Sequence, residues 1–258
     1  MKREDVISVC SLKGGVGRSL VSASLALALA RRGLRVLLVD LDPYTHTLDL
    51  FLGLEDRRLF GLSDILLGRP PEKTLLCREE IPRLFLCPAS DSPFLPDEEA
   101  LSRFLLLIGE RVQVDKVILD LPPSAEKERW FAPLSARHLV VSTQNPASLL
   151  AAAKTAESLS LTEGDGAWLL LNRFDLADLS SYSGGRMCAR EMIDLVGLAL
   201  IGIVPEAYDL SRRSEEGTLW RHEKEIDRPF DNVAARLLGE ERLLFDGMKE
   251  GKKTRRSL

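Results

Sequence analysis

The sequence predicts a doubly wound, three-layer α/β fold with a mostly parallel sheet. Short, continuous apolar runs recur along the 258 residues, longer helical patterns separate them, and Gly, Pro and Asp mark where the runs end. Continuous rather than alternating apolarity indicates strands that are covered on both faces. Strands that alternate with helices are typical of a parallel sheet with crossover helices.

The predicted strands share a length of seven or eight residues and a content rich in Val, Leu and Ile. Buried helix segments would give similar apolar runs, but this short length and the flanking Gly, Pro and Asp favour strands. The strands are expected at residues 5–12, 35–41, 83–89, 116–122, 138–144, 167–174 and 198–205.

The predicted helices lie between these strands. The clearest is 18–33, where an Ala- and Leu-rich pattern ends in two arginines and Gly33, a common helix stop. Others are expected at 62–68, 97–112, 146–160 and 190–197, with loops at 90–99 and 180–186. We expect residues 1–247 to form a single domain and the basic segment 248–258 to be a disordered tail.

Composition excludes several classes of protein. The chain has 35 basic and 39 acidic residues, so its formal charge of −4 does not indicate a nucleic-acid partner. Cys10, Cys77, Cys87 and Cys188 form no C-x-x-C pair, which argues against a zinc or iron–sulfur site. No apolar run approaches the ~20 residues that span a bilayer, and the N-terminus lacks a signal-peptide pattern, so a cytoplasmic protein is expected.

A glycine-rich loop follows the first predicted strand. Residues 8–20 read SVCSLKGGVGRSL, and a helix is predicted from residue 18. Glycines in such a loop allow backbone amides to approach phosphate oxygens, and the helix N-terminus favours negative charge. Ser19 stands where a hydroxyl binds Mg²⁺. A purely structural turn is the alternative, but the matched positions favour a phosphate site.

Carboxylates follow two other predicted strands. RVLLVDLD ends with Asp40 and Asp42, and VILDLPP carries Asp120 before two prolines. The carboxyl ends of strands in a doubly wound sheet face the ligand crevice. Asp120 is suited to holding the hydration shell of Mg²⁺, and Asp42 to polarising an attacking water. Helix capping is the simpler alternative for one such aspartate, but two sites beside a phosphate loop favour a role in binding.

These motifs together resemble the ParA/MinD family of deviant Walker A P-loop ATPases, and MinD-like members most of all. The chain is therefore expected to have the P-loop NTPase fold, and the likeness covers roughly residues 5–238. It rests on K-G-G-V-G, on LLVDLDPYTHTLDLFLGLEDR (37–57), on VILDLPPS, on LLLNRFD and on IGIVPEAYDLSRRSEEG.

The resemblance implies a role for each matching residue. Lys13 would reach across an ATP-bound dimer to the partner's phosphates, and Asp42 would position the attacking water. Asn172 would bind the adenine edge, and Arg173 would stack on the base. The residues implied around ATP are Gly14, Gly15, Val16, Gly17, Arg18, Ser19, Leu20, Asn172, Arg173, Pro205 and Glu206, and those around Mg²⁺ are Ser19, Asp40 and Asp120.

Two residues in the loop depart from the family pattern, which has lysine at Arg18 and a hydroxyl residue at Leu20. A planar guanidinium does not replace a compact ammonium conservatively among backbone amides. The leucine cannot donate a hydroxyl hydrogen bond to the α-phosphate, a loss of about 1.5–3 kcal/mol. ATP binding with slow hydrolysis is therefore expected.

The resemblance also implies partners and a cellular role. The expected function is an ATP-dependent homodimer that positions a division site, pilus, flagellum or DNA molecule, and that responds to an activating protein. Relatives bind the membrane or the nucleoid, and a docked final helix within 232–253 is favoured here over membrane insertion. A non-hydrolysing scaffold of the CpaE/TadZ type is the alternative, and FlhG-like regulators also fit. Metal-cluster insertion does not, because paired cysteines are absent.

Overall fold

A single twisted sheet forms the centre of the protein in the computed structural model, which describes residues 2–90, 96–162, 164, 166–176, 187–244 and 246. The order within this eight-stranded sheet is β3-β4-β2-β5-β1-β6-β7-β8, and β3 alone runs antiparallel to its neighbour in the described part. The strands are β1 (Val6–Cys10), β2 (Val36–Asp40), β3 (Leu76–Arg78), β4 (Ile81–Cys87), β5 (Lys116–Asp120), β6 (Arg137–Ser142), β7 (Ala167–Phe174) and β8 (Leu200–Pro205).

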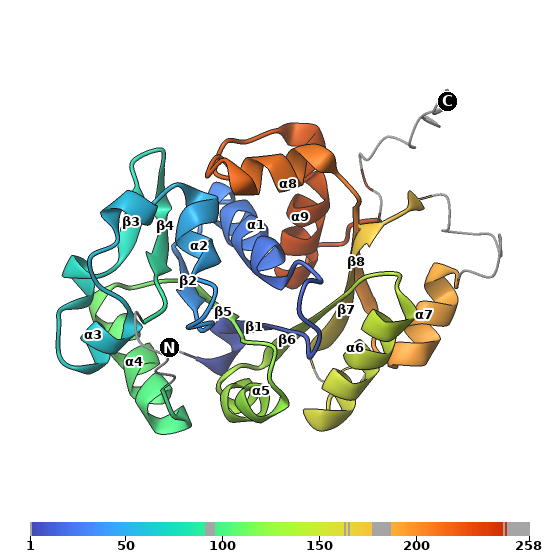
Figure 1. Ribbon diagram of the computed structural model, residues 1–258, viewed down its shortest axis with the longest axis horizontal. Coiled ribbons are helices and arrows are strands. Elements are labelled where there is room, and N and C mark those ends of the chain that lie inside the picture. The colour runs from blue at the N-terminus through green and yellow to red at the C-terminus, as the bar shows by residue number, and fades with distance from the viewer. Residues whose placement is uncertain are drawn as a thin grey trace.

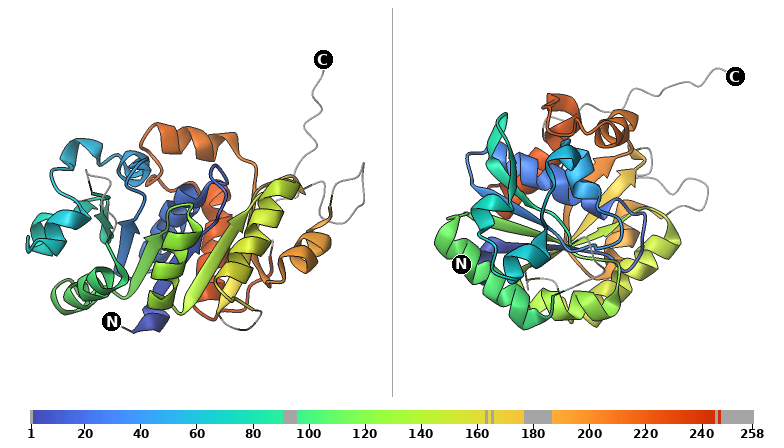
Figure 2. Two further views of the ribbon diagram at one scale, coloured as in Figure 1. Left: turned by 60° about the horizontal axis from the view of Figure 1, so that its bottom comes forward. Right: turned by 60° about the vertical axis from the view of Figure 1, so that its left-hand side comes forward.

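Helices cover both faces of the sheet, which confirms the predicted three layers (Figure 1). The helices α1 (Arg18–Arg31), α2 (Thr47–Leu52), α8 (Tyr208–Glu215) and α9 (Lys224–Leu237) pack on one face. The other face carries α3 (Leu62–Leu66), α4 (Glu98–Arg111), α5 (Ala125–Phe131), α6 (Pro146–Ser158) and α7 (Ala189–Val196). Figure 2 shows these two helical layers from further directions.

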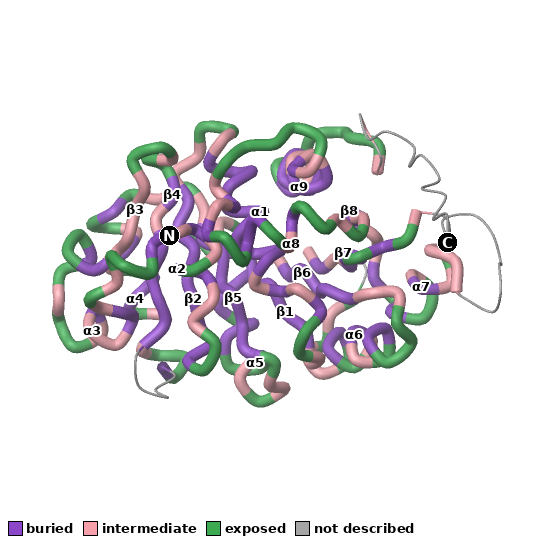
Figure 3. Tube along the Cα trace, turned by 45° about the horizontal axis from the view of Figure 1, so that its top comes forward, coloured by how far each residue is buried: buried purple, intermediate pink, exposed green. Residues whose placement is uncertain are grey.

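The apolar core consists of two clusters, one on each side of the sheet. Residues of β1, β2 and β5 are buried almost throughout, and the burial colouring follows them through the middle of the molecule (Figure 3). Two-sided burial explains why these strands read as unbroken apolar runs in the sequence. It also explains the Ala-rich helix α1, which is buried on nearly every side.

The order in which strands are added to the sheet changes sides at β1. From β1 the chain moves outwards to β2 and β4, returns to β5, and then crosses β1 to reach β6. Ligands of doubly wound sheets bind at such a switch point, outside the carboxyl ends of the strands. The loop after β1 and the carboxylates at the ends of β2 and β5 all lie at this edge, because Asp40 and Asp120 are paired in register and Val9 lies opposite Asp120.

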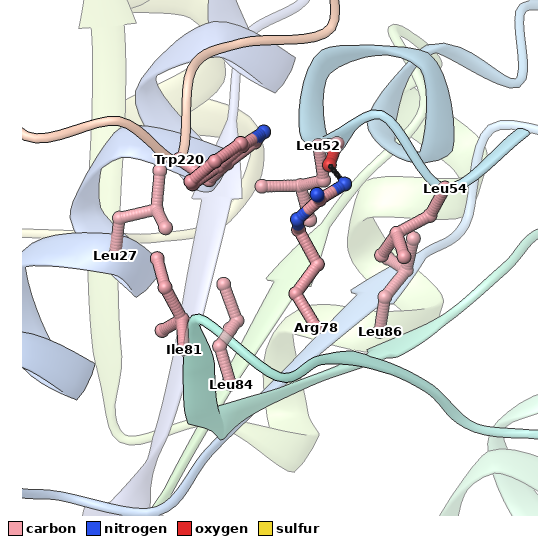
Figure 4. A pocket seen from close by; sticks show the side chains of 8 residues that line it. All are labelled: Leu27, Leu52, Leu54, Arg78, Ile81, Leu84, Leu86 and Trp220. Atoms are coloured by element: carbon pink, nitrogen blue, oxygen red, sulfur yellow. Dashed lines mark hydrogen bonds between the residues drawn. The ribbon is translucent and has the colours of Figure 1, made fainter.

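A small apolar cavity lies where α1, α2 and β4 meet the segment before α9 (Figure 4). Trp220 covers it, and the Arg78 guanidinium lies 4.3 Å from the indole ring while donating hydrogen bonds to the carbonyls of Leu52 and Gly53. The volume of about 10 Å³ is no larger than one water molecule. The cavity lies between the end of α2 and the α8–α9 connection, and it is too small to hold a ligand.

The C-terminal helix α9 is docked against the protein. Phe230, Val233 and Leu237 are buried in the core cluster that contains α1. The helix ends at Leu237, so within the described part of the predicted 232–253 segment only residues 232–237 are helical, and Leu243 is exposed in the described stretch that follows. The predicted tail 248–258 and loop 180–186 lie outside the described residues. Across the described part of the chain, no helix is long and apolar enough to cross a membrane.

Candidate nucleotide-binding site

The glycine-rich loop joins the buried end of β1 to the first turn of α1. Gly15 and Gly17 have φ angles of 78° and 86°, a left-handed conformation that favours glycine. The amides of Gly14, Gly15 and Gly17 donate no hydrogen bond to any residue that the structure describes. Free amides ahead of a helix N-terminus are the groups that bind phosphate oxygens.

Residues at the end of β7 hold this loop from behind. The side-chain amide of Asn172 donates to the Val16 carbonyl at 2.8 Å, and Arg173 donates to the Gly15 carbonyl at 3.3 Å. A Cβ atom on Gly17 would lie 2.3 Å from Asn172 Nδ2, so a side chain cannot fit there without displacing Asn172. The structure thus brings Asn172 and Arg173 to the loop itself, where they fix its carbonyls. Their expected contacts with adenine stay predictions.

The side chain of Arg18 does not point toward the phosphate position above the loop, although the sequence predicts that it does. It is the first residue of α1, but its guanidinium is 7% exposed and faces two carboxylates instead of open solvent above the loop. Nε lies 3.4 Å from Asp120 Oδ1, Nη2 lies 3.6 Å from Asp42 Oδ2, and Nη1 donates to the Ser11 carbonyl at 3.4 Å. The side chain predicted to contact phosphate therefore pairs with Asp42, which follows β2, and with Asp120, the last residue of β5.

Leu20 also differs from expectation. Its side chain is buried in the core cluster shared by α1 and the sheet. An apolar side chain in the first turn of a buried helix gains more from the core than from the polar loop. Only the backbone of Leu20 is thus available to a phosphate.

Three carboxylates are buried at this edge of the sheet, and two of them, Asp42 and Asp120, pair with Arg18. Asp40, Asp42 and Asp120 are 3%, 6% and 0% exposed. The Asp42 amide donates to Asp40 Oδ1 at 3.0 Å, and the Ser22 hydroxyl donates to Asp120 Oδ1 at 2.9 Å. Burial raises the pKa of Asp40 well above its usual range, and the negative charge of Asp120 adds to this. Burial also raises the pKa of Asp120, against the opposing effect of the Arg18 charge.

These oxygen ligands fit a hydrated Mg²⁺ ion. Asp120 Oδ2 is buried without a hydrogen-bond partner among the described residues, and one guanidinium pairs with both Asp42 and Asp120, so negative charge is in excess. The described part contains no group of three His, Cys, Asp or Glu placed to hold a metal ion, so waters or phosphate oxygens would complete the coordination of an ion here. Mg²⁺ keeps several waters and takes phosphate oxygens as ligands. Ser19, Asp40 and Asp120 would hold it together with a nucleotide, and the ion would neutralise phosphate charge.

The remaining predicted residues lie around the same edge. Lys13 is half-buried, and its ammonium group forms no ion pair with the part of the chain that is described. Pro205 ends β8, and Glu206 is exposed with its amide donating to the Phe174 carbonyl at 3.1 Å. Lys13 is thus available for a partner, and the β8 end lies next to the β7 end that carries Asn172.

Glu128 is a residue of the site that the sequence did not reveal. It lies on α5, is fully buried, and its Oε1 accepts a hydrogen bond of 2.8 Å from the Ser11 amide. Burial raises its pKa to about 7, although the Ser11 amide and the Arg18 charge act in the opposite direction. Its partner is 117 positions away in the chain, and the surrounding AEKERWF resembles a surface helix. A Glu between charged neighbours gave no signal of burial.

Residues 7–220 match the family model described as the CobQ/CobB/MinD/ParA nucleotide binding domain. The chain belongs to this family. The free loop amides and the strand-end carboxylates are therefore parts of a nucleotide-binding domain, and the ParA/MinD resemblance of the sequence is confirmed.

Several proteins similar to this member of the CobQ/CobB/MinD/ParA family are MinD proteins. Septum site-determining protein MinD of Neisseria meningitidis serogroup B is 27% identical over 254 residues, covering 92% of each chain. MinD of Synechocystis is 29% identical and covers 94% of this chain and 92% of its own length. The structure of the MinD cell division protein of Aquifex aeolicus superposes with a TM-score of 0.80 at 27% identity, covering 93% of this chain and 99% of its own.

Proposed function

We propose that this protein is a MinD/ParA-like ATPase that dimerises when ATP binds and positions another cellular structure. The observation that carries the proposal is the loop after β1, whose glycine amides are free while Asn172 and Arg173 hold its carbonyls. ATP and Mg²⁺ are the proposed ligands. Lys13 and Asp42 are the proposed catalytic residues, with Ser19, Asp40 and Asp120 near the metal.

Relatives support a role in spatial organisation. MinD proteins are named for septum-site determination, and a solved structure of Aquifex aeolicus, 27% identical with a TM-score of 0.81, is a MinC:MinD cell division complex. We therefore infer a regulatory protein partner and a cytoplasmic protein that associates at the inner face of the membrane or with the nucleoid. Hydrolysis is proposed to be slow or to need that partner, because Arg18 pairs with Asp42 and Asp120 in place of phosphate.

The same Arg18 geometry favours one alternative, a nucleotide-gated scaffold of the CpaE/TadZ type that does not hydrolyse ATP. In a hydrolytic cycle Asp42 must be free to act on water, but here it is paired with Arg18 at 3.6 Å. The two functions share ATP-dependent dimerisation and differ in turnover. The Arg18→Lys variant distinguishes the two functions by its rate of ATP turnover.

Light scattering after size-exclusion chromatography tests the dimerisation step. The purified chain is run with Mg-ATP, with Mg-ADP and without nucleotide, beside Lys13→Ala and the control Lys73→Ala, which removes an exposed lysine from the segment before β3. We expect a dimer of the wild type and of Lys73→Ala with ATP alone, and a monomer of Lys13→Ala. A wild-type chain whose mass is the same in all three conditions would contradict the proposal.

A further inference from the structure

The guanidinium of Arg18 lies between the carboxylates of Asp42, just after β2, and Asp120, at the end of β5. Its Nε and Nη2 atoms lie 3.4 Å from Asp120 and 3.6 Å from Asp42, while Nη1 donates to the Ser11 carbonyl. The three contacts use three different nitrogen atoms of one planar fork. A lysine ammonium is a single point charge and cannot reproduce this arrangement.

Because these contacts are buried, their loss should lower the stability of the protein strongly. The side chains of Arg18, Asp42 and Asp120 are 7%, 8% and 1% exposed, so water does not screen them effectively. An ionised carboxylate that is buried without a partner is strongly disfavoured, and removing one partner of a buried pair is correspondingly costly. In the absence of a metal, Arg18 supplies the positive charge that Asp42 and Asp120 need.

A divalent ion held by Ser19, Asp40 and Asp120 would share one of these carboxylates, Asp120, with Arg18. Asp120 Oδ1 already contacts Arg18 and the Ser22 hydroxyl, and Asp42 Oδ2 also contacts Arg18. An ion with two positive charges beside the guanidinium would repel it at close range. The ion and Arg18 therefore compete for Asp120, and the ion can bind fully only when Arg18 leaves.

We propose that Arg18 is the resident counter-cation of Asp42 and Asp120. Mg²⁺ has to displace the Arg18 guanidinium in order to bind. While the guanidinium is in place, the stability of the nucleotide-free protein does not depend on divalent ions. This inference rests on the proposed function only in naming Mg²⁺ and nucleotide as the incoming ligands. Once displaced, the guanidinium becomes available to phosphate oxygens. Nucleotide can also bind without Mg²⁺, because Arg18 already neutralises the carboxylates beside the phosphates.

Thermal unfolding of the nucleotide-free chain tests the proposal. Wild type, Arg18→Met and Arg213→Met are melted with EDTA or with millimolar MgCl₂ at matched ionic strength. Arg213→Met is a matched control, because Arg213 is 2% exposed and pairs with buried Asp227 at 3.0 Å on the α8–α9 side. Both variants should lower the melting temperature by about 6 °C or more. Mg²⁺ should restore most of the loss in Arg18→Met, and change neither the wild type nor Arg213→Met.

The proposal is overturned if Mg²⁺ stabilises the wild type as much as Arg18→Met, or if Mg²⁺ leaves Arg18→Met unchanged. If Arg18→Met does not fold in EDTA but shows a cooperative unfolding transition in Mg²⁺, the proposal is supported. If Arg18→Met folds in neither buffer, Arg18→Lys replaces it as the test. The lysine variant keeps a charge but loses the fork, so its melting temperature should rise with Mg²⁺ more than that of the wild type. An equal response of the two proteins counts against the proposal.

Fluorescent ADP binding, with and without Mg²⁺, gives a second readout. The wild-type dissociation constant should change by less than about threefold when Mg²⁺ is removed, and that of Arg18→Lys by more than about tenfold. Equal dependence on Mg²⁺ in both proteins contradicts the inference. If neither protein binds ADP, the proposed function fails, and the thermal data on Arg18 still decide this inference separately.

Discussion

Nε of Arg18 lies 3.4 Å from Oδ1 of Asp120, inside the protein and not in the space above the loop. This relationship separates the present chain from the family pattern, in which a lysine at the same position is expected beside phosphate. The first prediction follows from it. Arg18→Lys should bind ATP and raise steady-state turnover by at least about tenfold, because a released Asp42 can act on water. Phosphate release assays measure this, and an unchanged rate would favour the non-hydrolysing scaffold.

Gly17 supports a second prediction, which concerns the stability of the loop. Gly17→Ala places a Cβ atom 2.3 Å from Asn172 Nδ2 at a left-handed φ of 86°. The strain and the loss of the Asn172 bond to Val16 should lower the free energy of unfolding by about 2 kcal/mol or more. Urea denaturation measures it.

Gly14→Ala is the control for that variant, since nothing lies within 4 Å of a Cβ at Gly14 and its φ is not left-handed. This change should alter the free energy of unfolding by less than about 0.5 kcal/mol. Equal effects of the two substitutions would show that the Asn172 contact does not support the loop.

The buried carboxyl of Glu128 gives a pH-dependent prediction. Burial raises its pKa from 4.5 to about 7, so between these values the unfolded chain is ionised while the folded chain holds a proton. Glu128 therefore lowers stability progressively as the pH rises through this window. Glu128→Gln keeps an acceptor for the Ser11 amide without the charge. It should be more stable than the wild type by up to about 3 kcal/mol above the window and equally stable below it. Urea unfolding across this pH range checks this, and a constant difference would contradict it.

The buried ring of His138 on β6 gives a second pH-dependent prediction, in which stability changes with pH in the opposite direction. Its ring accepts or donates a 2.8 Å hydrogen bond with the Ser8 hydroxyl, and burial lowers its pKa from 6.5 to about 4. Between these values the unfolded chain binds a proton that the folded chain does not, so stability is lost as the pH falls. Relative to His138→Gln, the wild type should lose about 3 kcal/mol across the window. Parallel pH profiles of the two proteins would rule out this assignment.

The sheet could be predicted well from the sequence, because two-sided burial leaves continuous apolar runs. All seven predicted strands exist, while β3 was missed, since three half-buried residues at an antiparallel edge carry little pattern. The helices α2, α5 and α8 were missed for a similar reason. Each has at most eight residues, and α8 is largely polar.

The candidate site could be predicted as a set of residues but not as a set of contacts. Loop, carboxylates and Asn172 come together because strand ends meet at one edge of a parallel sheet. The direction of the Arg18 side chain depends on three groups from separate elements, and no local pattern encodes it. Glu128 was missed because its burial arises from the packing of α5 against the loop, 117 positions away.

Calorimetric titration of the purified chain with Mg-ATP shows whether the loop after β1 binds nucleotide. We expect saturable binding that Ser19→Ala weakens by about tenfold, since one hydrogen bond to a charged group is worth about 1.5–3 kcal/mol. Lys73→Ala should bind as the wild type does. Absence of binding to the wild-type chain at millimolar Mg-ATP would contradict a nucleotide site at this loop.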